Sequence, residues 1–215
     1  MKSVLVIGLG RFGRSAVKKL YELGHEVLAV DWTEERVNNV LQYTTEAMIG
    51  DSTSVDFLKS LGIDNFDLCI VAIGDNFEHS VITTYHLREL GAKKIVARAA
   101  RETHKKFLLH NGADEVVYPE KQLAEWTAIR YSQDHIFDYI KLDNTNAIFE
   151  IEIPKAWVNS TLLQLDVRKK WGINVIAVRR DGRVEMEIDP KMVLTDDMSL
   201  FVAGNSKNIK KMLNK

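Results

Sequence analysis

The first half of the chain alternates short apolar runs with longer amphipathic stretches. The apolar runs have the length and composition of strands, which we expect at residues 3–7, 26–30, 46–49, 68–73, 94–98 and 115–118. The stretches between them predict helices at residues 12–23, 34–43, 53–61, 76–90 and 102–111. Glycine follows several of these helices, as is usual just beyond a helix end. This order of elements predicts an α/β fold with a doubly wound, parallel, Rossmann-like sheet.

The pattern changes after Pro119, which begins a helical stretch with apolar residues roughly on one face. Beyond it we expect a small α+β C-terminal subdomain. Its expected elements are strands near 139–143, 147–153, 173–180, 183–188 and 198–204, one helix over 161–172 and a short basic helix at the end. Asp181-Gly182 between two of these strands predicts a tight hairpin. The expected domains are residues 1–120, a linking helix at 121–138, and residues 139–215.

Composition excludes some classes of protein. The 215 residues are 46% hydrophobic, which suffices for two cores. With 29 Lys and Arg against 30 Asp and Glu, the chain has no bulk positive charge to bind a nucleic acid polymer or an anionic membrane. The apolar run at Leu68–Ile73 is too short to span a bilayer, and the start of the chain resembles a core strand more than a signal peptide. The single cysteine, Cys69, suits a reducing cytosol, so we expect a cytoplasmic protein, and any membrane role would have to be exercised through a partner.

A glycine-rich loop, VIGLGRFG, joins the first strand to the first helix. Gly8, Gly10 and Gly13 form G-x-G-x-x-G, in which the first glycine permits a tight turn, the second lets a phosphate approach, and the third packs the helix on the sheet. The helix N-terminus offers free N–H groups to an anion. Asp31 ends the second strand, where a carboxylate accepts ribose hydroxyls and repels a 2′-phosphate. The loop therefore predicts a nucleotide site with a free ribose.

Other polar residues follow the strands of this predicted sheet. Arg11 adds positive charge toward the phosphates, which favours ADP or ATP, although it also fits a solvated loop position. Gly50-Asp51-Ser52 and Gly74-Asp75-Asn76 follow the third and fourth strands at the edge where such sheets bind ligands. Both also fit ordinary turns or helix caps.

Catalysis finds no support in the sequence. The six histidines do not have the spacing of metal ligands, and we expect them at the surface or at helix caps. We expect Cys69 to be buried and to pack in the core. The four tryptophans are scattered and are expected to pack rather than to stack on a ligand.

The linked motifs VIGLGRFG, GHEVLAVD, GDST, VAIGDN, GADEVVYPEK and LDVRKKWGINVIAV strongly resemble the KtrA/TrkA family, the RCK-type regulatory subunits of bacterial potassium uptake systems. The resemblance covers essentially the whole chain. It implies homodimers assembled into an octameric ring, docked on a membrane-embedded potassium-translocating subunit. It also implies that exchange of ATP for ADP, or binding of NAD or NADH, changes the ring and gates the pore.

The resemblance also implies roles for individual residues. The phosphates would be held by Gly8, Gly10, Arg11, Phe12 and Gly13, the ribose by Asp31, and the base by Asp51 and Ser52, with Gly74 beside them. Arg98 would reach phosphates or the dimer partner. Glu120 corresponds to an acidic residue that helps to bind a divalent or monovalent cation near the phosphates, although it equally fits the first turn of a helix. Relatives often have Lys at the position of Arg98 and Asn at that of Asp51, so these contacts can differ here.

The C-terminal subdomain matches positions that bind cyclic di-AMP in KtrA-like relatives. These positions are Leu162, Leu163, Asp166, Arg168, Ile173, Asn174 and Pro190. Arg168 could pair with a phosphate, whereas the leucines and Ile173 also fit plain core packing.

Two hypotheses thus remain. In the first, the chain is a ligand-sensing regulatory subunit that turns nothing over. In the second, it is a small NAD-dependent oxidoreductase, which would need an acid or base from a segment with no histidine after His135. The sequence favours the first.

Overall fold

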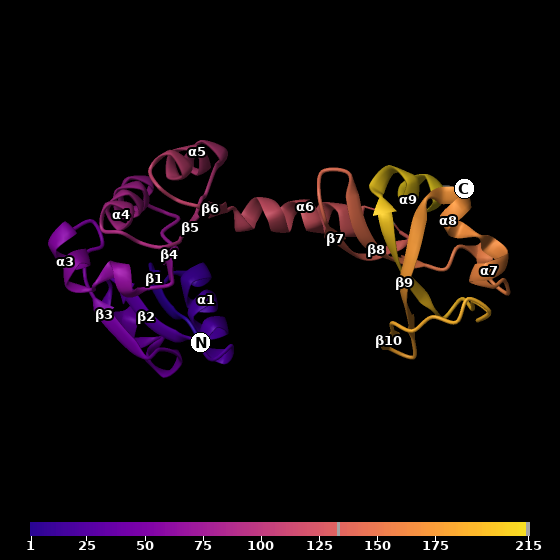
Figure 1. Ribbon diagram of the computed structural model, residues 1–215, viewed down its shortest axis with the longest axis horizontal. Coiled ribbons are helices and arrows are strands. Elements are labelled where there is room, and N and C mark those ends of the chain that lie inside the picture. The colour runs from indigo at the N-terminus through magenta and orange to yellow at the C-terminus, as the bar shows by residue number, and fades with distance from the viewer. Residues whose placement is uncertain (133, 214–215) are drawn as a thin grey trace. The chain divides into compact units, whose positions relative to one another are not determined.

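The computed structural model describes residues 1–132 and 134–213 (Figure 1). They form two compact units, Met1–Gln122 and Leu123–Lys215, and each unit has its own sheet and its own hydrophobic core. None of the helices in the described residues is both long and apolar enough to cross a membrane.

Unit 1 is built on a six-stranded sheet in which all neighbouring strands run parallel, in the order β3-β2-β1-β4-β5-β6. The strands are β1 (Ser3–Ile7), β2 (Glu26–Asp31), β3 (Glu46–Ile49), β4 (Leu68–Val71), β5 (Ile95–Arg98) and β6 (Glu115–Val117). The order reverses direction between β1 and β4, which is the signature of a doubly wound fold. The predicted fold class is therefore confirmed, and the switch point marks where such folds bind ligands.

Helices cover both faces of this sheet (Figure 1). Val4 and Val6 of β1 pack with one cluster, and Leu5 and Ile7 pack with another, because side chains alternate between the faces of a strand. The first cluster includes residues of α1 and α2, and the second includes residues of α3, α4 and α5. These helices are α1 (Arg11–Glu22), α2 (Glu34–Asn38), α3 (Val55–Ser60), α4 (Phe77–Glu89) and α5 (Glu102–His110), with 3₁₀ turns η1 (Leu41–Tyr43) and η2 (Ile63–Asn65).

Two elements of unit 1 differ from the prediction for identifiable reasons. The single helix expected over residues 34–43 is α2 followed by η1, because a tighter turn, in which Val40 N–H donates to Val37 at 3.1 Å, buries both valines in one cluster. Asn38 and Asn39 at the break are poor helix residues. The strand expected at 68–73 ends at Val71, and the residues directly beyond it line a pocket at the carboxyl edge of the sheet.

Unit 2 has a five-stranded antiparallel sheet in the order β10-β9-β11-β8-β7. Helix α6 (Pro119–Tyr131) carries the chain from unit 1 into it, and the described part of the linking segment expected at 121–138 also contains the start of β7. The strands are β7 (Ile136–Lys141), β8 (Asn146–Glu152), β9 (Ile173–Arg180), β10 (Arg183–Glu185) and β11 (Ser199–Asn205). The remaining helical elements are η3 (Lys155–Trp157), α7 (Leu162–Leu165), α8 (Val167–Trp171) and α9 (Ser206–Leu213). The predicted α+β subdomain is confirmed.

Details of unit 2 both agree with and differ from the prediction. Asp181 and Gly182 form the predicted two-residue hairpin, and both have the positive φ that such a turn requires. The helix predicted over residues 161–172 is broken into α7 and α8 at Asp166, whose φ of 45° lies in the left-handed region. Strand β7 starts at Ile136 rather than at 139, because buried Ile136 pairs with Ile151 of β8.

Candidate nucleotide-binding site

A pocket of about 270 Å³ lies in unit 1 at the carboxyl edge of the parallel sheet. The segments that follow β1 to β4, Arg98 at the end of β5 and Glu120 beyond β6 contribute to its wall, so it occupies the switch point of the doubly wound fold. Its volume is close to the roughly 300 Å³ at which small-molecule sites begin. Most residues that the sequence predicts for a nucleotide line this pocket, namely Gly8, Gly10, Arg11, Phe12, Asp31, Asp51, Ser52, Gly74, Arg98 and Glu120.

The three glycines of the loop have three different environments. Gly8 has a φ of 92°, which an L side chain rarely adopts. A Cβ at Gly13 would lie only 1.9 Å from the carbonyl oxygen of Gly8, so Gly13 allows α1 to pack against the loop and does not itself line the pocket. A Cβ at Gly10 would meet no protein atom within 4 Å, although Gly10 lines the pocket. The space over Gly10 is therefore open to a ligand.

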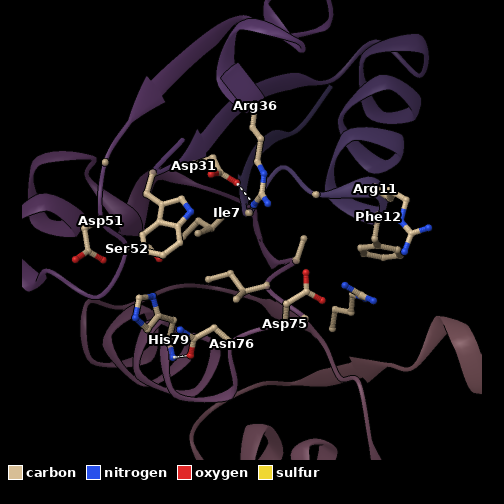
Figure 2. Close-up of a pocket in the computed structure, with 18 of the residues that line it drawn as sticks. Ile7, Arg11, Phe12, Asp31, Arg36, Asp51, Ser52, Asp75, Asn76 and His79 are labelled. Atoms are coloured by element: carbon tan, nitrogen blue, oxygen red, sulfur yellow. Dashed lines mark hydrogen bonds and ion pairs between the residues drawn. The ribbon is translucent and has the colours of Figure 1, made fainter. Parts of the chain in front are cut away.

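The N-terminus of α1 forms one end of the pocket. Gly10 caps this helix without a side-chain hydrogen bond, and the first turn of α1 carries no acidic residue. The free N–H groups and the positive end of the helix dipole therefore face an anion without competition from the chain. Arg11 and Phe12, the first two residues of α1, lie at this end, well apart from Asp51 and His79 (Figure 2).

Asp31 is held rigidly at the end of β2. One carboxylate oxygen accepts the Leu9 N–H at 2.7 Å, and the other accepts the Thr33 N–H at 2.9 Å. Nη1 of Arg36 lies 3.6 Å from the first of these oxygens (Figure 2). Each carboxylate oxygen has two lone pairs, so both retain acceptor capacity for ribose hydroxyls. The geometry thus fits the role predicted for Asp31 and adds Arg36 beside it.

Asp51 and Ser52 occupy the end of the pocket remote from α1. Asp51 accepts hydrogen bonds from the backbone N–H of Thr53 at 2.9 Å and from its hydroxyl at 2.7 Å, and these bonds hold the pKa of the Asp51 carboxyl below its usual range. Ser52 is buried, and its hydroxyl shares a 2.8 Å hydrogen bond with Thr83 of α4. Both side chains shape this end of the pocket.

An ion pair between Arg98 and Glu120 lies at the pocket wall. The Arg98 guanidinium packs directly on Gly74, where a Cβ would lie 2.0 Å from Nη1. The backbone N–H of Glu120, together with the guanidiniums of Arg98 and Arg11, holds the pKa of the Glu120 carboxyl below its usual range. Across the described residues, no three His, Cys, Asp or Glu side chains gather as metal ligands. One carboxylate that is already paired is a poor cation site by itself.

The sequence reasoning did not select several residues of the pocket wall. These are Ile7, Trp32, Arg36, Ala72, Ile73 and His79, whereas Gly50, Asp75 and Asn76 belong to the two segments that the sequence analysis places at this edge. Trp32 was expected to pack, but it is 62% exposed and lines the pocket, so that expectation is wrong. Its position directly after Asp31 was the available signal. Asn76 accepts the His79 N–H at 3.0 Å and caps α4, so the cap interpretation holds for this residue (Figure 2).

Two buried titratable groups elsewhere in unit 1, Cys69 and His104, have structural roles. Cys69 is fully buried, and burial raises the pKa of its thiol to about 12, which agrees with the packing role predicted for it. His104 is buried, and its Nδ1 accepts the Ala100 N–H at 3.3 Å ahead of α5, which fits a capping role. Burial, with nearby Arg101 and Arg98, lowers the pKa of His104 and favours its neutral form.

The residues predicted for cyclic di-AMP lie in unit 2 with different exposures. Leu163, Asp166, Arg168, Asn174 and Pro190 are exposed, and the Leu163 N–H donates to the Pro190 carbonyl at 2.9 Å. Leu162 is half-buried against the core, and Ile173 has no exposed surface in the single chain. A separate, shallow basic pocket is lined by Lys170, Trp171, Gly172, Asn208 and Lys211, none of which is a predicted residue.

Comparison with family models assigns both units. Residues 4–119 match the model of the TrkA-N domain, and residues 147–215 match that of the TrkA-C domain. The "Ktr system potassium uptake protein C" of Bacillus subtilis (strain 168) is 40% identical to this chain over 208 residues, which are 97% of this chain and 94% of the relative.

Solved structures share the fold. The GsuK RCK domain has a TM-score of 0.72 at 18% identity, covering 99% of this chain and 47% of that one. The GsuK channel bound to NAD has a TM-score of 0.69 at 19% identity, covering 96% of this chain and 38% of that one. This chain thus spans less than half the length of either GsuK chain.

Proposed function

The chain belongs to the family of potassium-uptake proteins with TrkA-N and TrkA-C domains, and from this premise we propose that it is a nucleotide-sensing regulatory subunit. In this proposal it binds ATP or ADP, and the bound nucleotide biases its conformation and so gates a separate, membrane-embedded potassium-translocating subunit. The observation that carries the proposal is the open space over Gly10 between the α1 N-terminus and fixed Asp31.

Each part of a nucleotide has a counterpart in the pocket. The phosphates would lie over Gly10 and receive N–H groups from α1, with the charge of Arg11 nearby. The ribose hydroxyls would donate to Asp31. Gly13, behind the loop, would keep α1 close enough for its N-terminus to reach the phosphates.

Two cations at the phosphate end favour ATP or ADP as the physiological pair. Arg11 and Arg98 both line the pocket. Two guanidiniums can pair with the terminal phosphates of ADP or ATP, whereas both phosphates of a dinucleotide are esterified to a nucleoside and carry less charge. Because the GsuK channel bound to NAD has the same fold, NAD and NADH are the alternative pair.

We infer that nothing is turned over at this site. Two carboxylates that line the pocket are engaged, Asp31 by two backbone N–H groups and Glu120 by Arg98. Their role is then to bind and orient rather than to move a proton. A small NAD-dependent oxidoreductase is the alternative, and a test for hydride transfer distinguishes it.

Assembly and location follow from the same proposal. Helix α6 has no buried residue in the single chain, and its Leu123 and Tyr131 are largely exposed. A second copy covering this helix would bury them, as the proposed homodimer and octameric ring require. The ring would be cytoplasmic and would meet the membrane only through its potassium-translocating partner.

Two further ligands belong to the proposal. A divalent or monovalent cation at Glu120 would need nucleotide phosphates, or the Glu120 of a second copy, as additional ligands, because Arg98 already pairs with the single carboxylate. Cyclic di-AMP in unit 2 would use exposed Arg168 and Asn174, while Leu162 and Ile173 would support the site from the core.

The experiment is a comparison of ligands on the full chain. ATP, ADP and NADH are titrated while the melting temperature is recorded, and the same samples are assayed for nucleotide hydrolysis and for hydride transfer. Stabilisation by ATP and ADP without turnover is expected. Turnover of a nicotinamide cofactor would contradict the regulatory function and support the oxidoreductase. If none of the three ligands stabilised the protein, the proposed nucleotide site would be wrong.

A further inference from the structure

The pocket has a direction that locates the nucleobase. Phosphates belong at the α1 N-terminus and the ribose at Asp31, so the base must lie farther along the pocket, away from Arg11. Asp51, Ser52 and His79 occupy that side, opposite Arg11 and Phe12 (Figure 2). Trp32 follows Asp31 directly in the chain and lines the same pocket.

Trp32 and His79 form an aromatic pair from two separate elements. Trp32 follows β2 and His79 lies in the first turn of α4, yet their ring centroids are 5.5 Å apart with an interplanar angle of 74°. This is the edge-to-face arrangement that aromatic rings favour. The histidine therefore fixes the orientation of the indole and leaves much of the ring uncovered, since Trp32 is 62% exposed.

The backbone beneath Trp32 is also fixed. The carboxylate of Asp31 accepts the Thr33 N–H at 2.9 Å, and this bond spans the tryptophan. On the other side, Asn76 caps α4 by accepting the His79 N–H at 3.0 Å. The backbone at both residues is thus held by local hydrogen bonds and the two rings pack edge to face, which lowers the entropy cost of using them to bind.

We propose that Trp32 and His79 form an aromatic clasp for the nucleobase, in which the base stacks on the Trp32 indole and His79 orients that ring. The proposal rests on the nucleotide site proposed above and names what the site selects. Stacking energy grows with the area of the ring that is covered. The clasp therefore prefers purine nucleotides to pyrimidine nucleotides.

The test compares ligands with and without a large base on the wild type and four variants. The variants are Trp32→Ala, Trp32→Phe, His79→Ala and, as the control, Tyr85→Ala, which removes an exposed aromatic of α4 that does not line the pocket. Calorimetry measures the affinity of each for ADP, UDP and inorganic pyrophosphate. The emission of the tryptophans is recorded during the ADP titration.

The clasp predicts a base-specific loss. Trp32→Ala weakens ADP by about 5- to 150-fold, the range for loss of one base–aromatic stack, and weakens pyrophosphate by less than about 2-fold. The preference for ADP over UDP falls with it, and Trp32→Phe retains part of both. His79→Ala causes a smaller loss of the same kind, and Tyr85→Ala changes nothing. ADP alters the fluorescence of the wild type but not the emission of Trp32→Phe.

Two outcomes contradict the clasp, and a third contradicts the proposed function. If the wild type binds ADP and Trp32→Ala binds it equally well, the clasp is wrong while the nucleotide site stands. Equal weakening of ADP and pyrophosphate by Trp32→Ala also contradicts the clasp, because it would mean that the whole site was disturbed. If the wild type binds neither ADP nor UDP, the proposed function itself fails.

Discussion

Gly10→Ala and Gly13→Ala are expected to separate ligand binding from stability, although both add one methyl group to the same loop. At Gly13 the new Cβ would lie 1.9 Å from the Gly8 carbonyl oxygen, whereas real Cβ contacts essentially never fall under 3.0 Å. Helix α1 must therefore move by roughly 1 Å or the loop must deform. Overpacking of this kind costs about 1–3 kcal/mol.

At Gly10 the new Cβ meets no protein atom within 4 Å, and the backbone φ of −64° is accessible to alanine. Alanine gains a few tenths of a kcal/mol by restricting the unfolded chain and loses a similar amount as a poorer N-cap, so the net change in stability is about zero. The methyl group nevertheless occupies the space where a phosphate would approach the α1 N–H groups. We expect at least about a 10-fold loss of ADP affinity, which corresponds to about 1.4 kcal/mol.

The assay pairs thermal denaturation of each variant with calorimetric titration of ADP. Gly13→Ala lowers the melting temperature by about 2–4 °C for each kcal/mol lost, while Gly10→Ala leaves it unchanged. Gly10→Ala loses ADP binding despite an intact fold. Unaltered ADP affinity in a stable Gly10→Ala variant would refute the assignment of the open space to a phosphate, and full stability of Gly13→Ala would refute the packing argument.

Three further changes test separate parts of the molecule. Arg11→Ala should weaken ATP by about 10- to 150-fold and ADP much less, because a charge-assisted bond to the terminal phosphate is worth about 1.5–3 kcal/mol; equal weakening in calorimetry would remove that role. Asp31→Ala should weaken ADP, ATP and NADH alike, since each loses the acceptor for its ribose hydroxyls, and unchanged binding would move the ribose elsewhere. Hydrogen bonds from Asn146 and Thr145 hold the pKa of Asp143 well below its usual range, so Asp143→Ala should destabilise the fold near neutral pH. The folded pKa is the lower one, so this difference should shrink as the pH falls below about 3.8; urea melts that differ equally at all pH values would contradict it.

Most of the fold of unit 1 could be predicted from the sequence because local sequence signals and the tertiary fold agree there. Each strand is a short apolar run, each helix carries apolar residues at helical spacing, and the glycines of the first loop have spacings that only a strand–turn–helix can use. The position of Asp31 follows from the same pattern. The structure adds its fixed geometry, which depends on the Leu9 and Thr33 backbone.

The features that could not be predicted depend on tertiary contacts. The continuous pattern over residues 161–172 contained no proline or glycine before its end, yet the helix breaks at Asp166, an aspartate that tolerates the left-handed region. The Arg98–Glu120 pair joins residues 22 positions apart, and no local rule anticipates it. Trp32 was assigned to packing because tryptophan is usually buried, but its neighbour Asp31 marks the ribose position, and only the fold reveals His79 beside it.

Potassium flux measured with the membrane partner tests the central claim most directly. The proposed translocating subunit is isolated through its binding to this chain and reconstituted in liposomes, and flux is recorded with the wild-type chain or with Gly10→Ala, in ATP and then in ADP. The account predicts that flux differs between ATP and ADP with the wild type, that Gly10→Ala abolishes the difference, and that neither nucleotide is consumed. Identical flux in both nucleotides with a wild-type chain that binds them, or flux that requires their turnover, would contradict it.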